Sequence, residues 1–299
     1  MADILGGLLI VDKPAGPTSH DIVARARKLL HTKKVGHAGT LDPMATGVLV
    51  LGVERATKLL GLLTLTTKAY TATIRLGCAT TTDDAEGEVL TTAAAGHITD
   101  ADIAGEVAVL TGDIQQVPAT VSAIKVGGER AYARHRAGEE VTLAARPVTV
   151  SRFDVLARRD IAEPDVVDLD VVVECSSGTY IRALARDLGA ALGVGGHLTA
   201  LRRTRVGPFT LEHARTLEQL ADDPVPSLDI DAAVRLSFPH RVIGADEAEK
   251  LRDGRWLDPV GNTGVHAALT EDGRAIALLQ EKGKRAASVL VVRPRGLVD

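Results

Sequence analysis

The chain has 299 residues, of which 45% are hydrophobic and 25% charged, and its formal net charge is −4. These values are typical of an ordinary globular protein, and they argue against one that binds nucleic acid through overall charge alone. The two cysteines form no CxxC pair, so the sequence predicts neither a disulfide framework nor a zinc site. No uncharged apolar stretch has membrane-spanning length and no signal-peptide pattern opens the chain, so we expect a cytoplasmic protein without a membrane partner.

The first third of the chain predicts short strands and helices in alternation. An apolar strand over residues 8–11 ends in a turn rich in Pro and Gly, and Thr18 or Ser19 then caps a helix with one apolar face. The hydrophobic pattern next predicts a strand over 48–53, a helix over 54–63 and an alternating strand over 70–76.

The middle of the chain is more polar. Residues 78–87 are rich in Thr and Asp and predict an exposed loop, and residues 126–146 predict a mobile basic arm or a solvated loop. Between and after them we expect a helix over 101–110, a β-branched strand over 166–175 and an amphipathic helix that begins near Ile181.

Prolines at positions 224, 226 and 239 mark a boundary before the last sixty or so residues. Beyond it, the pattern predicts a short helix over 245–252 and strands over 265–269, 275–279 and 288–292. Strands and helices mix without regular βαβ spacing, which favours an α+β fold with mixed or antiparallel sheets. We therefore expect a catalytic domain over 1–238 and a small β-rich domain over 239–299.

The most informative stretch is residues 36–47, GHAGTLDPMATG, which has one carboxylate at its centre. Pro43 favours an extended conformation at Asp42, and the glycines allow unusual backbone angles. A single carboxylate held out beside a buried strand is a suitable nucleophile or acid–base group. An Asp before Pro in a Gly-rich stretch is also typical of a plain turn, and composition alone does not separate the two.

Several segments resemble the motifs of the TruB family of tRNA pseudouridine synthases, in the order of that family. Residues 36–47 resemble its catalytic motif, and the likeness spans nearly the whole chain. The other matching segments are DKPAG at 12–16, KAY at 68–70, DDAEG at 83–87, GTYIR at 178–182 and LRRT at 201–204. The C-terminal domain resembles the PUA RNA-binding domain of many members.

The resemblance implies an isomerase that converts a uridine in the T arm of tRNA, at position 55 of tRNA nomenclature, to pseudouridine. It implies no metal and no organic cofactor, and it implies base flipping of the target uridine. The partner would be the T stem-loop of tRNA, bound by a monomer that requires no protein partner.

By the same resemblance, Asp42 is the essential carboxylate, Arg182 is its ion-pair partner and Tyr70 lies against the flipped uracil. His37 would enter the T loop, and Asp84 would make a polar contact in or near the site. Lys13 would support the catalytic loop or contact backbone, and Tyr180 would line the pocket or bond near the Asp–Arg pair. Contacts to the substrate are also implied for Leu201, Arg202 and Arg203. The candidate phosphate contacts are the cations Lys33, Lys34, Arg130, Arg134, Arg136, Arg202, Arg203, Lys282, Lys284 and Arg285.

The sequence leaves two alternatives open. One is an RNA-binding or tRNA-folding protein whose catalytic role is secondary or lost. The other is a guide-RNA-dependent pseudouridine synthase, because that related group shares these motifs.

Overall fold

A computed structural model describes residues 5–119, 125–126, 129–130 and 144–297 of the chain. Its contacts divide the chain into two compact units. The first unit comprises Met1–Pro43, Gly47–Thr64 and Val206–Asp299, and the second comprises Met44–Thr46 and Leu65–Arg205. In the described part of the chain, no helix is long and apolar enough to cross a membrane.

The first unit contains an antiparallel sheet in the order β14-β1-β3-β2. Helix α1 begins after Thr18, whose side chain accepts a hydrogen bond from the backbone of Asp21 in a capping box. The elements of this part are β1 (Gly7–Lys13), α1 (Ser19–Leu29), β2 (Val35–His37), β3 (Thr46–Val53), the 3₁₀ helix η1 (Glu54–Leu59), α2 (Leu60–Thr64), β13 (Phe209–Thr210), the 3₁₀ helix η2 (Leu211–His213), α6 (Leu217–Asp222), β14 (Leu228–Asp229) and α7 (Ile230–Ser237).

The last part of the first unit forms a four-stranded sheet in the order β15-β16-β17-β18, in which β15 and β16 run parallel and the other pairs antiparallel. Its helix α8 packs Ala248 and Leu251 into a small core with apolar residues of the sheet. The elements are β15 (His240–Val242), α8 (Ala245–Arg252), β16 (Val265–Leu269), β17 (Ala275–Lys282) and β18 (Arg285–Val291). The helix and three strands predicted here are confirmed.

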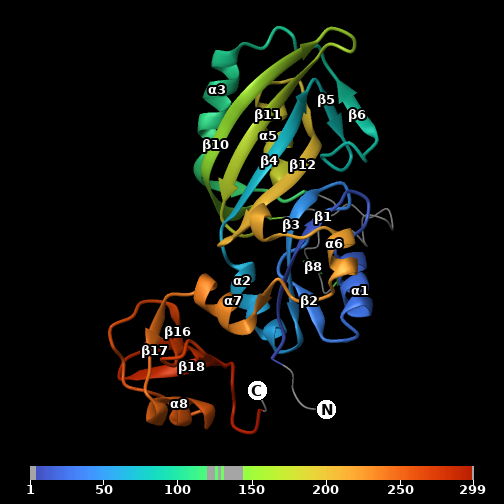
Figure 1. The fold of residues 1–299 in the computed structure, drawn as a ribbon. Helices are drawn as coiled ribbons and strands as arrows, with labels where there is room; N and C mark the ends of the chain where they lie inside the picture. The colour runs from blue at the N-terminus through green and yellow to red at the C-terminus, as the bar shows by residue number, and fades with distance from the viewer. Residues whose placement is uncertain (1–4, 120–124, 127–128, 131–143, 298–299) are drawn as a thin grey trace. The chain divides into compact units, whose positions relative to one another are not determined.

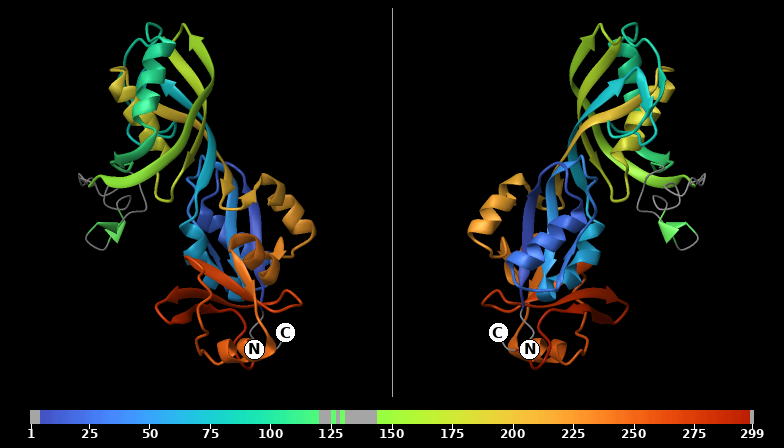
Figure 2. Two further views of the ribbon diagram at one scale, coloured as in Figure 1. Left: turned by 90° about the vertical axis from the view of Figure 1, so that its left-hand side faces the viewer. Right: turned by 90° about the vertical axis from the view of Figure 1, so that its right-hand side faces the viewer.

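The second unit contains a curved sheet in the order β12-β4-β11-β10-β7 (Figure 1). Figure 2 shows α3 and α5 against one face of this sheet, where their apolar residues are buried. The elements are β4 (Lys68–Leu76), β5 (Cys78–Thr80), β6 (Val89–Thr92), α3 (Asp100–Val109), β7 (Gly112–Gln116), β8 (Lys125–Val126), β9 (Glu129–Arg130), β10 (Arg146–Ile161), β11 (Val166–Cys175), α5 (Ile181–Ala191) and β12 (Gly196–Val206).

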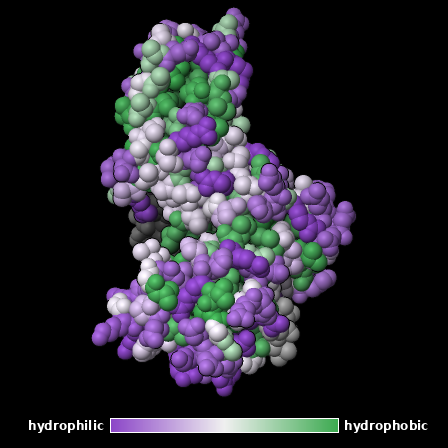
Figure 3. Space-filling view, turned by 60° about the vertical axis from the view of Figure 1, so that its left-hand side comes forward, coloured by the Kyte–Doolittle hydropathy of each residue, from purple (hydrophilic) through white to green (hydrophobic). Residues whose placement is uncertain are grey.

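The predicted α+β class with mixed and antiparallel sheets is confirmed. The boundary between residues 238 and 239 and the likeness of the last segment to a PUA domain stay predictions. Most of the basic arm predicted over 126–146 lies outside the described residues. On the face drawn in Figure 3, hydrophobic residues gather in a patch in the upper part of the view, and hydrophilic residues border it.

One local prediction is wrong in part. Residues 78–80 form β5, which pairs with β6, and Thr80, Asp83 and Asp84 are buried, whereas Ala85 and Glu86 are exposed as predicted. Polar composition indicated solvent exposure, but these polar groups are satisfied inside the protein by hydrogen bonds and ion pairs.

Candidate functional site

The loop that carries Asp42 connects β2 to β3 in the first unit, and its backbone is anchored immediately before that residue. The hydroxyl of Ser19 accepts a hydrogen bond from the Leu41 amide at 2.9 Å and donates one to the Leu41 carbonyl at 3.1 Å. Ser19 is fully buried at the start of α1. One side chain therefore satisfies both polar backbone groups of Leu41 and ties the loop to a helix.

The same loop is anchored immediately after Asp42. The ammonium of Lys13 donates hydrogen bonds to the carbonyl oxygens of Pro14 at 2.9 Å and Pro43 at 3.0 Å, and the Gly16 amide donates to Pro43 at 2.9 Å. Lys13 has no exposed surface, and a buried ammonium needs such partners to offset its desolvation. These contacts favour the alternative in which Lys13 supports the loop.

His37 ends β2, six residues before the second anchor. Its ring meets the ring of His20 edge to face, with centroids 5.4 Å apart and planes at 79°. Asp42 itself is half-buried. The first unit thus holds Asp42, Lys13 and His37, with Asp42 on a short loop whose neighbours on both sides are fixed.

In the second unit, Arg182 lies in the first turn of α5 and only 5% of its surface is exposed. Its Nη1 is 3.4 Å from Oδ2 of Asp84 and donates a hydrogen bond to the Thr82 carbonyl at 2.8 Å. Asp84 is also buried, and its Oδ1 accepts bonds from the Thr82 hydroxyl and the Glu86 amide. The structure thus brings together two predicted site residues, although the sequence did not indicate their pairing.

A second ion pair lies one helical turn further along α5. Arg186 is 3.2 Å from the carboxylate of Asp83, and it also donates to the Val117 carbonyl at 2.7 Å. Burial raises the pKa of the Asp83 carboxyl, and the nearby charges of Arg186 and Arg182 oppose this rise. Two arginines that lie one turn apart on α5 therefore form ion pairs with two consecutive aspartates of the 81–87 segment.

Tyr70 lies on β4 opposite Val173 of β11 and is 7% exposed. Two residues earlier, the buried Lys68 donates to the Thr66 carbonyl at 2.8 Å. Burial is the larger cause, and the charge of Arg203 the smaller, of a lowering of the pKa of Lys68 to about 8. This part of β4 is thus a buried environment in which a cation is costly.

Tyr180 precedes α5, and its peptide group is held by Gln116 at the end of β7. The Tyr180 amide donates to Oε1 of Gln116 at 2.8 Å, and Nε2 of Gln116 donates to the Tyr180 carbonyl at 3.1 Å. The sequence did not indicate Gln116, and it indicated Ser19 only as a possible helix cap and not as a support of the Asp42 loop. No local pattern indicated these contacts, because each joins one polar residue to a distant segment.

The predicted substrate-contact residues of the LRRT segment lie on β12. Leu201 and Arg203 are buried, at 7% and 1% exposure, while Arg202 is half-buried and donates to the Thr46 hydroxyl at 3.3 Å. Their contacts with a substrate stay predictions. The same holds for the ion pair between Asp42 and Arg182, which belong to different units.

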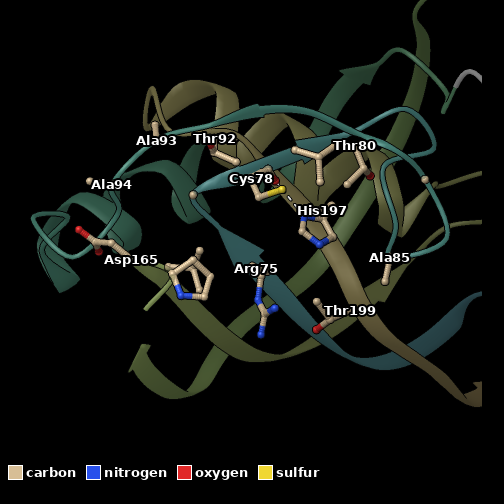
Figure 4. Close-up of a pocket in the computed structure, with 15 residues that line it drawn as sticks. Arg75, Cys78, Thr80, Ala85, Thr92, Ala93, Ala94, Asp165, His197 and Thr199 are labelled. Atoms are coloured by element: carbon tan, nitrogen blue, oxygen red, sulfur yellow. Dashed lines mark hydrogen bonds between the residues drawn. The ribbon is translucent and has the colours of Figure 1, made fainter. Parts of the chain in front are cut away.

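A pocket of about 660 Å³ lies in the second unit beside the β5–β6 pair (Figure 4). Its charged side chains are already engaged, because Arg75 forms a bidentate ion pair with Asp168 and Asp165 accepts a bond from the Gly96 amide. His197, which also lines it, is hydrogen-bonded through Nδ1 to the Cys78 carbonyl at 2.8 Å. Among the described residues that line this pocket there is none of the predicted site residues.

Three family models together match most of the chain. The TruB family pseudouridylate synthase N-terminal domain matches residues 27–181. The tRNA pseudouridylate synthase B C-terminal domain matches residues 182–228, and the C-terminal domain of tRNA pseudouridine synthase II matches residues 238–293.

Curated relatives are similar over nearly their full length. A tRNA pseudouridine synthase B of Nocardia farcinica is 82% identical over 297 residues, which cover 99% of this chain and 96% of that protein. A protein of the same name from Rhodococcus jostii is 73% identical over 292 residues, which cover 97% of this chain and 95% of that protein.

Solved structures are similar at lower identity. A chain in the crystal structure of a Cbf5-Nop10-Gar1 complex has a TM-score of 0.75 and 27% identity, and the match covers 99% of this chain and 87% of that one. A chain in the structure of an H/ACA RNP bound to a substrate RNA containing 2′-deoxyuridine has a TM-score of 0.73 and 26% identity. The match covers 99% of this chain and 88% of that one.

Proposed function

Because this chain belongs to the TruB family of pseudouridylate synthases and is therefore an isomerase, we propose that it converts uridine 55 in the T arm of tRNA to pseudouridine. The tRNA substrate is proposed from the names of relatives that are 82% and 73% identical to it. The proposed catalytic residues are Asp42, Tyr70 and Arg182. His37, Asp84, Lys13, Tyr180, Leu201, Arg202 and Arg203 are proposed as substrate-contacting or supporting residues.

One observation carries the assignment of Asp42. The residues on both sides of it are fixed by buried groups, Leu41 by Ser19 and Pro43 by Lys13. A plain surface turn needs no such anchoring, whereas a carboxylate that must meet a reacting atom gains rate from a fixed position.

The reaction breaks the N1–C1′ bond of uridine, turns the base and joins C5 to C1′. The Asp42 carboxylate would attack the base or the sugar, or assist departure of the uracil. Tyr70 would lie against the uracil and help remove the C5 proton, and Arg182 would orient the carboxylate through its guanidinium.

The target uridine sits in a folded RNA loop and must leave its stack first. Extrusion of a base costs a few kcal/mol, which contacts to the RNA must offset. Favourable phosphate contacts are the general source of such binding energy.

The test is release of tritium from T-arm RNA labelled at C5 of uridine, with wild type and Asp42→Asn compared. We expect release by wild type only, and tRNA affinity of the variant within a few-fold, because the amide keeps the shape but not the charge. Asp258→Asn, which removes an exposed carboxylate of the same unit, is the matched control and should release tritium at the wild-type rate. Full activity of Asp42→Asn would refute the catalytic role of Asp42.

The same assay separates the alternatives. Binding of the RNA without release by wild type would favour an RNA-binding or tRNA-folding protein. Solved neighbours occur in an RNP and in a complex with Nop10 and Gar1, so a guide-dependent enzyme is the second candidate. Activity of the purified monomer on bare tRNA transcript, without guide RNA or protein partner, would exclude it.

A further inference from the structure

The loop between β11 and α5 carries Tyr180 at its end, and its first residue is fixed to the sheet. The Ser176 amide donates to the Thr149 carbonyl at 2.8 Å, and the Ser176 hydroxyl accepts a bond from the Thr149 amide at 2.9 Å. Gly178 then turns the chain with a φ of +86°, a region that favours glycine. One end of the loop is therefore held, and the position of Tyr180 depends on what holds the other end.

Gln116 holds that other end. Its side chain pairs with the peptide group of Tyr180 as a neighbouring strand would, accepting from the amide at 2.8 Å and donating to the carbonyl at 3.1 Å. Gln116 is 2% exposed and is the last residue of β7, where the sheet register pairs it with Arg146. Burial excludes competing water, so loss of either bond would leave an unsatisfied polar group.

The two hydrogen bonds between Gln116 and Tyr180 fix the backbone at the start of α5. Tyr180 is the N-cap residue of this helix and makes no side-chain capping bond. Its carbonyl accepts the first helical bond, from the Leu184 amide at 3.2 Å, as well as the bond from Gln116. The carboxamide therefore fixes the peptide from which the first turn is built, and that turn contains Arg182.

We propose that Gln116 is a positioning residue for the isomerisation, which sets Tyr180 and the first turn of α5 so that the Arg182 guanidinium meets its target. This inference rests on the proposed function, because it assumes that Tyr180 and Arg182 act in the reaction. Gln116 acts through the backbone and contacts no substrate.

The first test compares Gln116→Met with Gln115→Met. Gln115 is the preceding residue of β7 and is exposed, so the same substitution in the same strand is a matched control. We expect kcat on T-arm RNA to fall about 10- to 100-fold for Gln116→Met, since displacements of about 1 Å have effects of that size. KM and the Kd for tRNA should stay within a few-fold, and Gln115→Met should behave as wild type.

A purely structural role predicts a different result. In that case Gln116→Met lowers the melting temperature but leaves kcat unchanged at a temperature at which circular dichroism shows the variant to be folded. That outcome, or equal kcat values for the two variants, overturns the proposal.

Gln116→Glu provides a second readout. The neutral carboxylic acid restores both bonds, because its O–H donates to the Tyr180 carbonyl and its C=O accepts from the amide. The carboxylate instead places a negative charge against that carbonyl. We expect kcat of the variant, divided by that of wild type, to rise about 10-fold or more as the pH falls from 8.5 to 6. A flat ratio together with a normal kcat for Gln116→Met contradicts the proposal.

The controls separate this proposal from the proposed function. If wild type and Gln115→Met form no pseudouridine in tRNA, the proposed function fails. If both are active and Gln116→Met matches them in kcat, only the positioning role fails.

Discussion

At the scale of single residues, the second unit keeps its buried charges in pairs contributed by different segments. Arg182 and Arg186 of α5 meet Asp84 and Asp83 of the 81–87 segment. Burying a charge is expensive unless a partner and hydrogen bonds compensate, and removing one partner leaves the other charge uncompensated. Substitutions that keep the charge but change its geometry are therefore more informative than deletions.

Arg182→Lys is such a substitution. Lysine keeps the charge near Asp84 but lacks the planar guanidinium, whose Nη1 also donates to the Thr82 carbonyl, and the two side chains are not equivalent where geometry matters. We expect kcat for pseudouridine formation to fall about 10- to 100-fold with tRNA affinity within a few-fold. Steady-state kinetics with a filter-binding measurement of Kd check this.

Arg186→Lys is the comparison variant, because Arg186 pairs with Asp83 one turn further along the same helix. We expect it to have the smaller effect on kcat. Equal losses for the two variants would indicate that both arginines serve the fold and would remove Arg182 from the reaction.

Because the pKa of Lys68 is lowered in the folded protein, we expect the free energy of unfolding to depend on pH. Burial lowers that pKa from 10.5 to about 8. Between these two pH values the unfolded chain binds more protons at Lys68 than the folded protein, so the contribution of Lys68 to stability rises with pH across this window. Below pH 8 the folded protein bears the full cost of the buried ammonium.

Lys68→Met removes that cost. The free energy of unfolding of wild type minus that of the variant should therefore increase by about 1–3 kcal/mol between pH 8 and pH 10.5. Urea unfolding at both pH values measures this difference, with Lys58→Met at an exposed position as the control for loss of a charge. A difference that does not change with pH would contradict the burial effect.

At the scale of elements, α5 can lie close to the start of β12 because its facing residue has no side chain. A Cβ added at Gly189 would lie 2.2 Å from the carbonyl carbon of Gly195 and from the amide nitrogen of Gly196. Backbone atoms cannot move aside as a flexible side chain can. This close approach sets how α5, and with it Arg182, sits on the sheet.

We therefore expect the substitution of alanine for glycine to change the free energy of unfolding in opposite directions at two helical positions of the second unit, Gly189 and Gly105. Gly189→Ala should lower the free energy of unfolding by about 3 kcal/mol or more through overpacking. Gly105→Ala, in the interior of α3, should raise it by about 0.5–1 kcal/mol, because a Cβ there meets nothing within 4 Å and alanine favours the helix. Thermal unfolding of both variants checks the pair, and equal signs would contradict the packing described for Gly189.

At the scale of the whole molecule, the net charge of −4 means that binding of an RNA must depend on local groups of cations. One such group is the turn between β17 and β18, where Lys282, Lys284 and Arg285 are all exposed. The Arg285 guanidinium lies 5.1 Å from the ring centroid of Trp256, which is 46% exposed. Exposed cations beside an exposed aromatic ring suit a phosphate backbone and an unstacked base.

We expect log Kd for tRNA to rise linearly with log salt concentration. The double variant Lys282→Ala/Lys284→Ala should reduce this slope by about 1 to 2, since each lost phosphate contact accounts for roughly 0.7–0.9. The control is Lys250→Ala/Arg255→Ala, which removes the same charge at two exposed positions in the last part of the first unit. Equal slopes for the two double variants would show that the β17–β18 turn does not contact the RNA.

The sequence by itself determined the positions of most of the predicted helices and strands, and the family to which the chain belongs. Apolar periodicity and helix caps depend on neighbouring residues, so the helices near Ser19, Asp100 and Ile181 were predictable within a residue or so. The segment over 54–63 was predicted as one helix and is a 3₁₀ helix followed by a short α-helix. The motif containing Asp42 indicated the family because it is long and specific.

Only the tertiary structure decided which polar residues support the candidate site. Ser19 meets Leu41 across 22 positions of sequence, Gln116 meets Tyr180 across 64, and Arg182 lies 3.4 Å from Asp84. Hydrogen bonds and ion pairs of this kind have no period in the sequence, and polar composition predicted solvent exposure for residues 78–87 where the fold buries three of them. Partners that a polar group acquires on folding are fixed by packing between distant segments, and for that reason they could be identified only in the folded chain.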